Sequence, residues 1–412
     1  MSSLQKPKLL VLGTGFAAFS LLKSLNRDSF DTTVISPRNH FLFTPLLPST
    51  TVGTLEFRSI IEPIRRGVPG IRYYQARCTK VDTIHKEIFC NGIIDDVPFR
   101  LEYDILVIAV GAVNNTYNIP GVEQHALFLK ELLDARAIRE RIIDCFERAS
   151  QPALSEDRRK HLLHFVVVGG GPTGVEFAAE MHDFIREDLR KPYSPLIPHV
   201  KITILEAGPS ILNTFDGVLS DYTARFFRRQ QIEVRTNSPV TRVETDAIVL
   251  KNGDIVPYGL LVWSTGIGPT KLVQSLSLPK SKSFRLITDA WFRVQGSDGL
   301  YALGDCAAFD SMEFPATSQV AQQEGRYLAK VLKYSLLGRS IAPFHYHHYG
   351  MLAYVGSNRA LADLAAVKGR GFSTWIFWRS AYLTKLVSLK NKILVVFDWM
   401  KTFVFGRDIS RF

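Results

Sequence analysis

The stretch that decides the fold is His164–Gly174, which reads HFVVVGGGPTG. A run typical of a buried strand leads into the pattern G-x-G-x-x-G, and a helix-like stretch follows. In such a unit the first glycine permits a tight turn, the second lets the backbone approach a pyrophosphate, and the third lets the helix pack against the strand. The phosphates then lie at a helix N-terminus, where N–H groups and the helix dipole favour anions. The stretch therefore predicts a dinucleotide-binding unit.

A further strand, Lys201–Leu205, ends at Glu206. An acid at this place accepts hydrogen bonds from a ribose 2′-OH and repels a 2′-phosphate, so we expect this unit to prefer NADH over NADPH. The alternative is that Glu206 is an ordinary solvated charge at the end of a strand.

A similar unit begins near the N-terminus with Lys8–Ala18, which reads KLLVLGTGFAA and contains G-x-G-x-x-A. We expect a helix over Phe19–Leu25 and a second strand over Thr32–Ile35. That strand is followed by Ser36 and Arg38 and by no acid. A serine hydroxyl can reach a ribose, and an arginine can contact the adenine half. One unit with the acid and one without indicate two different dinucleotides.

Each unit is followed by a second buried strand that ends in a small-residue turn. These strands lie in Tyr103–Ala112 and Gly259–Ile267. Their glycines, Gly111 and Gly266, follow Gly13 and Gly169 by 98 and 97 residues. The repetition predicts a duplicated nucleotide-binding architecture.

A third motif, Gly299–Ala307, reads GLYALGDCA. Asp305 at the end of a strand can hold a ribityl hydroxyl beside the ligand crevice. The alternative is an aspartate that caps the next helix.

Together these motifs resemble the two-dinucleotide-binding-domain flavoprotein oxidoreductases over roughly residues 8–330. The resemblance implies non-covalent FAD on the first unit and NADH on the second. The implied FAD residues are Gly13, Gly15, Phe16, Ala17, Ser36, Arg38, Thr44, Pro45, Gly111, Gly304 and Asp305. The implied NADH residues are Gly169, Gly171, Pro172, Thr173, Gly174, Glu176, Glu206, Thr265 and Gly266.

The cysteines narrow the choice within this superfamily. The chain has 4 Cys and no CxxC or CxxxxC pair, so it lacks the redox pair of the disulfide reductases. Cys306 is the one thiol expected near the flavin, and one thiol does not support sulfide:quinone reductase chemistry. The cluster His345–His348 has no acid or cysteine beside it, and we predict no metal site.

Two segments closely resemble signatures of the type II NADH dehydrogenases. They are Ser36–Pro48 (SPRNHFLFTPLLP) and Phe314–Gly325 (FPATSQVAQQEG), in which Ser318 stands where the family commonly has Ala. In that family the second segment forms part of the quinone site. The resemblance implies quinone contacts from Phe43, Pro45, Gln319, Gln322 and Gln323.

The expected reaction is hydride transfer from NADH to FAD, followed by two-electron transfer to a quinone without proton pumping. Glu176 opens the helix after the second glycine motif, so we expect it to orient the nicotinamide or relay a proton. The alternative is simple charge complementarity at a helix N-terminus. Gln319 and Gln323 are four residues apart and share a helix face, where their amides can bond quinone carbonyls. Ordinary surface glutamine is the alternative.

The C-terminal tail carries most of the excess charge of 50 Lys and Arg over 39 Asp and Glu, a net +11. Its aromatic and basic residues resemble the membrane-anchoring tail of eukaryote-like members, in Trp378–Tyr382, Phe397–Trp399 and Gly406–Arg411. Aromatic side chains interleaved with Lys and Arg suit a lipid headgroup zone. The alternatives are a helical hairpin packed on the core or in a homodimer interface; nucleic acid is disfavoured. We expect one amphipathic helical stripe through Tyr382, Leu383, Leu386, Leu389, Ile393 and Val396.

The predicted fold is therefore α/β, with two Rossmann-like dinucleotide-binding domains and a C-terminal amphipathic, membrane-associating segment. We expect an FAD domain at residues 1–122 and 285–340, an NADH domain at 123–284, and a membrane-anchoring or dimerisation region at 341–412. No apolar run reaches the ~20 residues that span a bilayer.

We expect a peripheral membrane enzyme that forms a homodimer and whose partners are NADH, a quinone and lipid. Residues 1–8 contain no secretory signal, which favours the cytoplasmic face of a bacterial inner membrane; the alternative is the mitochondrial inner membrane. Two other functions stay open: a soluble NADH-dependent reductase of a small iron–sulfur or rubredoxin-type carrier, and a redox-sensing flavoprotein.

Overall fold

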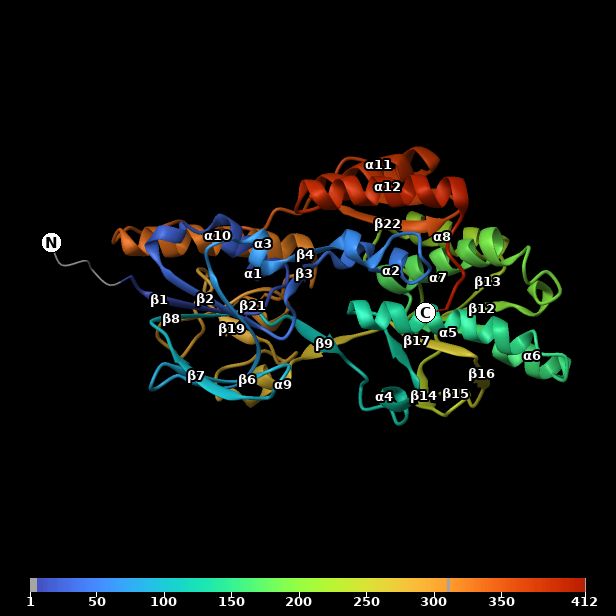
Figure 1. Cartoon of the computed structure of the whole chain (residues 1–412), viewed down its shortest axis with the longest axis horizontal. Helices are drawn as coiled ribbons and strands as arrows, with labels where there is room; N and C mark the ends of the chain where they lie inside the picture. Colours follow the sequence, from blue (N-terminus) through green and yellow to red (C-terminus); the bar gives the residue numbers. More distant parts are fainter. Residues whose placement is uncertain (1–5, 310–311, 412) are drawn as a thin grey trace. The chain divides into compact units, whose positions relative to one another are not determined.

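The computed structural model describes residues 6–309 and 312–411, and the first five residues of the N-terminal segment considered above lie outside this range. The chain forms two compact units (Figure 1). The first runs to Leu42 and adds Ile61–Val113 and Ile267–His347. The second comprises Phe43–Ile60, Asn114–Gly266 and the chain from His348 onward. The predicted α/β fold class with two Rossmann-like domains is confirmed.

The first unit is built on a seven-stranded sheet in the order β20-β8-β1-β2-β5-β6-β7. Its first five strands are parallel, and β6 and β7 continue it as antiparallel neighbours. The strands are β1 (Lys8–Leu12), β2 (Asp31–Ser36), β5 (Arg72–Asp82), β6 (Glu87–Gly92), β7 (Pro98–Glu102), β8 (Ile105–Ile108) and β20 (Leu300–Ala302).

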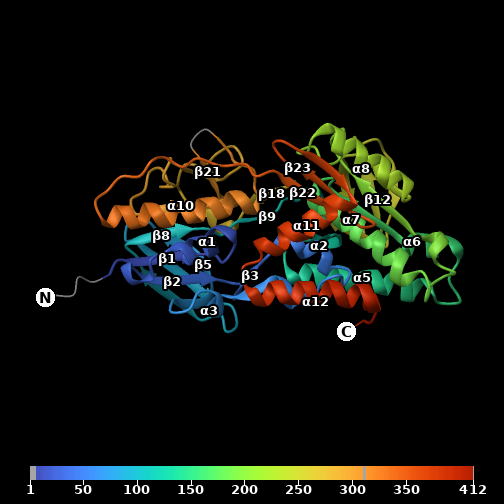
Figure 2. The same cartoon turned by 90° about the horizontal axis from the view of Figure 1, so that it is seen from above.

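Two helices lie side by side on this sheet, α1 (Phe16–Ser24) and α10 (Ser318–Leu336), as both views show (Figures 1 and 2). Helix α1 begins at Phe16, three residues before the predicted start, because the glycine motif leads directly into its first turn. Gly325 allows the close approach of the two helices: a Cβ atom there would lie 2.2 Å from the carbonyl oxygen of Ala17.

The second unit is built on a five-stranded parallel sheet in the order β10-β17-β11-β12-β13. Helices α5 (Leu132–Ala149) and α7 (Pro172–Phe184) pack on it, and a π-helical turn over Ile185–Leu189 extends α7. The strands are β10 (Leu127–Phe128), β11 (His164–Val168), β12 (Lys201–Leu205), β13 (Ile232–Arg235) and β17 (Leu260–Trp263).

The end of the chain forms an antiparallel three-stranded sheet followed by two helices. The strands are β22 (Met351–Gly356), β23 (Arg359–Asp363) and β24 (Lys368–Gly371), and the helices are α11 (Phe372–Lys385) and α12 (Leu389–Phe405). In residues 6–309 and 312–411 we find no helix with the length and apolar character needed to cross a membrane.

The single helical stripe predicted through Tyr382, Leu383, Leu386, Leu389, Ile393 and Val396 is wrong. Helix α11 ends at Lys385, and Ser388 caps a new helix by accepting a hydrogen bond from the backbone of Asn391. Leu386 is buried in the turn, whereas Leu389 and Ile393 are exposed. Serine favours helix N-caps, and this local signal interrupts a pattern that hydrophobic spacing alone reads as continuous.

The unit boundaries differ from those of the expected domains. Residues 267–284 and 341–347 group with the first unit, whereas 43–60, 114–122 and the tail from 348 group with the second. The segment 43–60 is held there by hydrogen bonds from Ser49 and Thr54 to Glu180 of α7, both 2.7 Å. The assignment of the two units to FAD and NADH stays a prediction at this stage.

All but one of the remaining elements, a helix of 13 residues, are short. They are β3 (His40–Leu42), β4 (Ile61–Pro63), β9 (Ala112–Asn114), β14 (Val240–Val243), β15 (Ala247–Leu250), β16 (Ile255–Pro257), β18 (Ile267–Pro269), β19 (Leu286–Thr288), β21 (Ala307–Phe309), α2 (Leu47–Thr50), α3 (Ile64–Gly67), α4 (Val122–His125), α6 (Glu156–Leu162), α8 (Gly217–Arg229) and α9 (Lys271–Ser275), with 3₁₀ turns η1 (Arg27–Ser29), η2 (Thr44–Leu46), η3 (Phe57–Ile60), η5 (Ile197–His199) and η6 (Gly304–Cys306).

The contact between α1 and α10 gives a stability prediction. Gly325→Ala adds a methyl group against the Ala17 backbone, so we expect it to lower the free energy of unfolding by about 2 kcal/mol. Urea denaturation at equal cofactor concentration measures the effect. Lys330→Ala on the exposed side of α10 is the control and should change stability by less than ~0.5 kcal/mol. An unchanged midpoint for Gly325→Ala would show that the helices can separate at no cost.

Candidate functional site: two dinucleotide cradles

The first glycine motif forms a turn that only glycine fits. Gly13 has φ +109°, and a Cβ there would lie 2.2 Å from the carbonyl oxygen of Ala109. Gly15, which precedes α1, has no heavy atom within 4 Å of the corresponding Cβ position. Gly111 at the next strand end is open in the same way and has φ +65°. The backbone is therefore close-packed under the turn and open above Gly15, which fits a pyrophosphate at the helix N-terminus.

The end of β2 is tied to this turn. The Thr14 hydroxyl lies 3.0 Å from the Ser36 hydroxyl, which also accepts a hydrogen bond from the Arg38 backbone at 3.2 Å. The Arg38 side chain donates to the carbonyl of His40 at 3.1 Å. Ser36 is buried, so its hydroxyl orders the loop of the cradle; a contact between Ser36 and a ribose stays a prediction. Phe16 and Ala17 form the first turn of α1.

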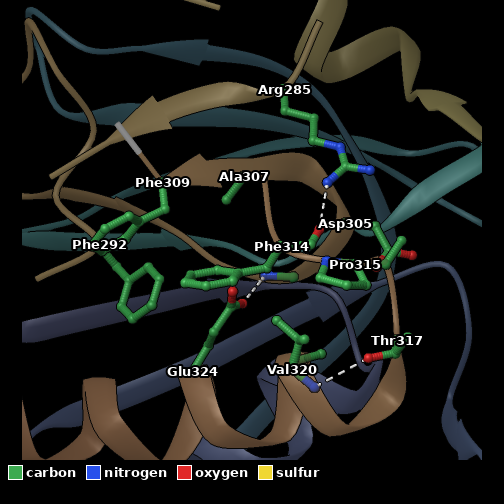
Figure 3. Close-up of a pocket in the computed structure, with 13 residues that line it drawn as sticks. Arg285, Phe292, Asp305, Ala307, Phe309, Phe314, Pro315, Thr317, Val320 and Glu324 are labelled. Carbon is green, nitrogen blue, oxygen red and sulfur yellow. Dashed lines mark hydrogen bonds between the residues drawn. The ribbon is translucent and has the colours of Figure 1, made fainter. Parts of the chain in front are cut away.

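The Gly-Asp motif does not cap a helix. Asp305 lies inside η6, and strand β21 follows directly, so the capping alternative is wrong. Asp305 lines a cavity of the first unit, with residues from α10 on its floor (Figure 3). The residues around this cavity are Arg285, Phe292, Gly304, Asp305, Ala307, Phe309, Phe314, Pro315, Ala316, Thr317, Val320, Ala321 and Glu324.

The predicted quinone glutamines lie on one helix, and one of them has another role. Gln319, Gln322 and Gln323 belong to the first turns of α10, which begins after its cap Thr317. The Gln323 amide donates to the carbonyl of His347 at 2.8 Å and accepts from the backbone of His347 at 3.0 Å. Gln323 is therefore buried and holds the chain that follows α10, whereas Gln319 and Gln322 are half-buried.

The remaining predicted flavin and quinone residues belong to the second unit. Thr44 and Pro45 begin η2, and Phe43 precedes them. The Phe43 ring is buried and contacts the ring of Tyr382 edge-on, with centroids 6.1 Å apart. This segment is thus packed against α11 within its own unit.

The second glycine motif repeats the geometry of the first. Gly169 has φ +112°, and a Cβ there would lie 2.5 Å from the carbonyl oxygen of Ser264 and 2.9 Å from the Cβ of Thr265. Gly171 is open, and Pro172 begins α7 at the position where a missing N–H costs least. A Cβ on Gly174 would lie 2.1 Å from the Gly169 carbonyl oxygen, so this glycine permits the tight start of α7. Thr173 lies between these glycines, and Gly266 has φ +68° in the facing turn.

Glu206 lies at the rim of this cradle, where the strand order predicts it. One carboxylate oxygen accepts a hydrogen bond from the backbone of Gly170 at 2.7 Å, and the other accepts from Gly208 at 2.7 Å. These two bonds fix the carboxylate beside the glycine motif. They argue against an ordinary solvated charge and fit a group that reads the ribose of a dinucleotide.

Helix α7 presents a line of buried acids. Glu176 accepts a hydrogen bond from the backbone of Tyr354 at 3.0 Å, and burial raises its pKa to about 8. Charge complementarity at a helix N-terminus would instead lower this pKa, so burial dominates. Glu180 accepts bonds from Ser49 and Thr54, and burial raises its pKa too.

Asp183 completes the line, with bonds from the Tyr354 hydroxyl at 2.6 Å and the Ser357 backbone at 2.9 Å. Arg407 near the end of the chain lies 3.9 Å from Glu180 and 2.8 Å from Asp188. Glu180, Asp183 and Arg407 are not among the site residues predicted from the sequence. Acids at positions 176, 180 and 183 share one face of a largely apolar helix, which was the available signal.

Cys306 is buried, and burial raises the pKa of its thiol to about 12, so no reactive thiolate forms there at neutral pH. Over the described parts of the chain, no three His, Cys, Asp or Glu side chains gather in a way that could hold a metal ion.

Comparisons with known proteins agree with this geometry. Residues 7–325 match the family model of the pyridine nucleotide-disulphide oxidoreductases, and residues 348–408 match the NDH2 C-terminal domain. A "probable NADH dehydrogenase" of Dictyostelium discoideum is 48% identical over 99% of this chain and 92% of its own length. The "external NADH-ubiquinone oxidoreductase 2, mitochondrial" of Saccharomyces cerevisiae is 41% identical over 99% of this chain and 83% of its own.

Solved structures extend the likeness to the fold. NDH2 from Plasmodium falciparum, in complex with NADH, superposes with a TM-score of 0.95 at 30% identity and covers 99% of this chain and 100% of that one. A sulfide:quinone oxidoreductase from Aquifex aeolicus shares the fold alone, with a TM-score of 0.74 at 16% identity over 98% of this chain and 96% of that one. The chain belongs to the type II NADH dehydrogenases, within the pyridine nucleotide-disulphide oxidoreductase family.

Proposed function

We propose that this chain is an NADH:quinone oxidoreductase that transfers a hydride from NADH to non-covalent FAD and then two electrons to a quinone, without pumping protons. The observation that carries the proposal is the pair of cradles, of which only the second has an acid at its rim. When bound, FAD supplies the chemistry that links a two-electron donor to a quinone. The names of the yeast relative and of the Plasmodium complex support the same donor and acceptor class.

Each unit binds one of the two dinucleotides. In the first, the open backbone at Gly15 and Gly111 and the carboxylate of Asp305 hold FAD. In the second, the open backbone at Gly171 accepts the pyrophosphate of NADH, and Glu206 selects a free 2′-OH. A 2′-phosphate would be repelled by the fixed charge of Glu206.

The quinone residues are assigned with one change of role. Gln319 and Gln322 on α10 contact the quinone. Gln323 positions the segment at His347, because both ends of its amide are already used there.

The tail associates with a membrane surface. Helices α11 and α12 expose a set of large apolar side chains, which we call the tail face: Phe372, Ile376, Phe377, Leu389, Ile393, Val396, Phe397, Met400, Phe403, Val404 and Phe405. Lys390 and Lys392 flank it, and Arg379 lies between the rings of Trp375 and Trp399, at 4.0 and 4.6 Å. A soluble carrier reductase needs no such surface.

The relatives favour one of the two expected locations. The yeast relative and an Arabidopsis thaliana relative with 39% identity over 99% of this chain are both named mitochondrial. We therefore propose the mitochondrial inner membrane as its location in preference to a bacterial one. The tail face is also the surface through which a homodimer would form.

Stopped-flow flavin absorbance without oxygen tests the reaction. NADH should bleach the flavin, and a soluble ubiquinone analogue should restore it. Wild type should use NADH at least ~100-fold better than NADPH in kcat/KM. Glu206→Gln removes the charge, so it should lower kcat/KM for NADH about tenfold and raise kcat/KM for NADPH relative to that for NADH.

Glu233→Gln on the neighbouring strand β13 is the control and should leave the NADH preference unchanged. Bleaching that quinone cannot reverse would discard the quinone assignment and favour the carrier reductase. An unaltered nucleotide preference in Glu206→Gln would remove Glu206 from the ribose site.

Glu176 gives a pH prediction. The folded pKa of about 8 lies above the ordinary 4.5, so the folded state holds more protons than the unfolded state between these values. Stability should therefore fall as pH rises from about 4.5 to about 8. Glu176→Gln mimics the protonated form, and its free energy of unfolding at pH 9 should exceed that of wild type by roughly 2–4 kcal/mol.

At pH 5 the Glu176→Gln difference should nearly vanish, and Asp221→Asn on the exposed side of α8 should have no effect at either pH. Thermal or urea unfolding measures both. The same variant separates the two roles of Glu176. If the pH dependence of kcat has an inflection near pH 8 that disappears in Glu176→Gln, Glu176 relays a proton. If the pH dependence of kcat is unchanged and the KM for NADH rises, Glu176 orients the nicotinamide.

The tail face gives a membrane prediction. Phe397→Ser with Phe403→Ser removes two aromatic side chains that are 60% and 91% exposed. Binding to vesicles of phosphatidylcholine and phosphatidylglycerol should weaken at least ~10-fold, measured by flotation. The matched control is Ile84→Ser with Ile94→Ser, at 86% and 89% exposure in the first unit. Equal loss in both double variants would contradict a specific tail face, and loss of dimer without loss of lipid binding would assign the face to dimerisation.

A further inference from the structure

Glu324 is a buried acid that the proposed reaction does not use. It lies on α10 and is only 4% exposed. Its Oε2 accepts a hydrogen bond from the Gly304 backbone at 2.6 Å, across the cavity floor in Figure 3. Gly304 has φ +70° and begins the turn that carries Asp305. One helix thus fixes the turn of the Gly-Asp motif through a single carboxylate.

The surroundings of Glu324 raise the free-energy cost of its ionised form. Burial raises the pKa of Glu324 to about 7, and the neighbouring charge of Asp305 acts in the same direction. The Gly304 N–H and Arg285 act against it. The titratable and charged groups that face Glu324 are Asp305 and Cys306 from η6 and Arg285, whose guanidinium also donates to the carbonyl of Phe314 at 3.3 Å.

A neutral side chain of the same shape would avoid this cost. Glutamine has an oxygen that can accept the Gly304 N–H, and it loses far less hydration on burial than an ionised carboxyl. A charged acceptor makes a hydrogen bond about twice as strong as a neutral one, which is what the carboxylate adds at this turn. Acids that are held against their solvation preference concentrate at functional sites.

We infer that Glu324 is a positioning residue for FAD, which holds the Gly304–Asp305 turn from α10 so that Asp305 is presented to the cofactor. The inference rests on the proposed function, because it assumes that the first unit binds FAD. It adds to that function a residue that need not touch the cofactor. Since the ionised form makes the stronger bond to Gly304, FAD should be held more tightly when Glu324 is ionised.

The test is FAD binding to the full-length apoprotein, followed by flavin fluorescence at pH 6 and pH 8. At pH 8 we expect Glu324→Ala to raise the Kd for FAD about tenfold or more and Glu324→Gln about threefold. At pH 6 the wild type should approach Glu324→Gln, because its carboxyl is then largely protonated. Arg326→Ala, exposed on the same helix, is the matched control and should bind FAD as wild type does.

A second readout separates positioning from a merely structural role. Thermal unfolding of the apoprotein at pH 8 should give Glu324→Gln a Tm at or above that of wild type, because the variant removes a buried charge. Weaker FAD binding without lower stability supports the inference.

Two results would overturn the inference while FAD still binds: the same Kd in wild type and Glu324→Gln at both pH values, or a ratio between them that does not grow from pH 6 to pH 8. If Glu324→Ala fails to fold, the glutamine variant alone decides. Absence of FAD binding by the wild type would overturn the proposed function itself and, with it, the inference.

Discussion

The structure depends on a steric constraint at the end of two parallel strands. At Gly13 and Gly169 the backbone has positive φ, and the carbonyl oxygen of a facing turn occupies the space of a side chain, 2.2 and 2.5 Å from the missing Cβ. Any other residue would push the neighbouring turn away and change the direction of the helix that follows. Because the turn is tight, only three residues separate α1 and α7 from the strands before them, and the helix N-termini face open space at Gly15 and Gly171. The proposed anion sites are thus a consequence of strand packing.

A second theme is that acids are buried where these helices meet other parts of their own unit. On α7, Glu176 accepts a hydrogen bond from β22, Glu180 accepts one from the segment 43–60, and Asp183 accepts one from the Ser357 backbone. On α10, Glu324 accepts one from the turn η6. Each carboxylate is satisfied by N–H or O–H donors, which offsets part of the cost of removing it from water. Such bonds are directional, so they fix positions that apolar packing alone would leave looser. Burial raises the pKa values of Glu176 and Glu324, which makes the contacts of these two acids sensitive to pH near neutrality.

The sequence predicts the parts of the fold that local rules control. The strands at Lys8–Leu12, His164–Val168 and Lys201–Leu205 follow from apolar runs before glycine turns, and the place of Glu206 follows from strand order. Contacts between residues distant in the chain could not be derived in this way. Nothing near Gln323 indicates that its amide bonds to His347, and nothing near Ser49 indicates its bond to Glu180, 131 residues away. The break before α12 was readable from Ser388, but hydrophobic spacing hid it.

Helix α12 buries two polar residues beside Val395 and Trp399 and exposes a row of apolar ones. Its inward side carries Asn391 and Asp398, which are 1% and 4% exposed and bond to Ser59 and to the Glu56 backbone. Its outward side carries Leu389, Ile393 and Phe403, at 73%, 60% and 91% exposure. A helix selected only for folding in water would turn these faces around. Because the polar groups are satisfied inside, they hold the helix together with the buried side chains of Val395 and Trp399, and the exposed apolar side chains are not needed for this packing.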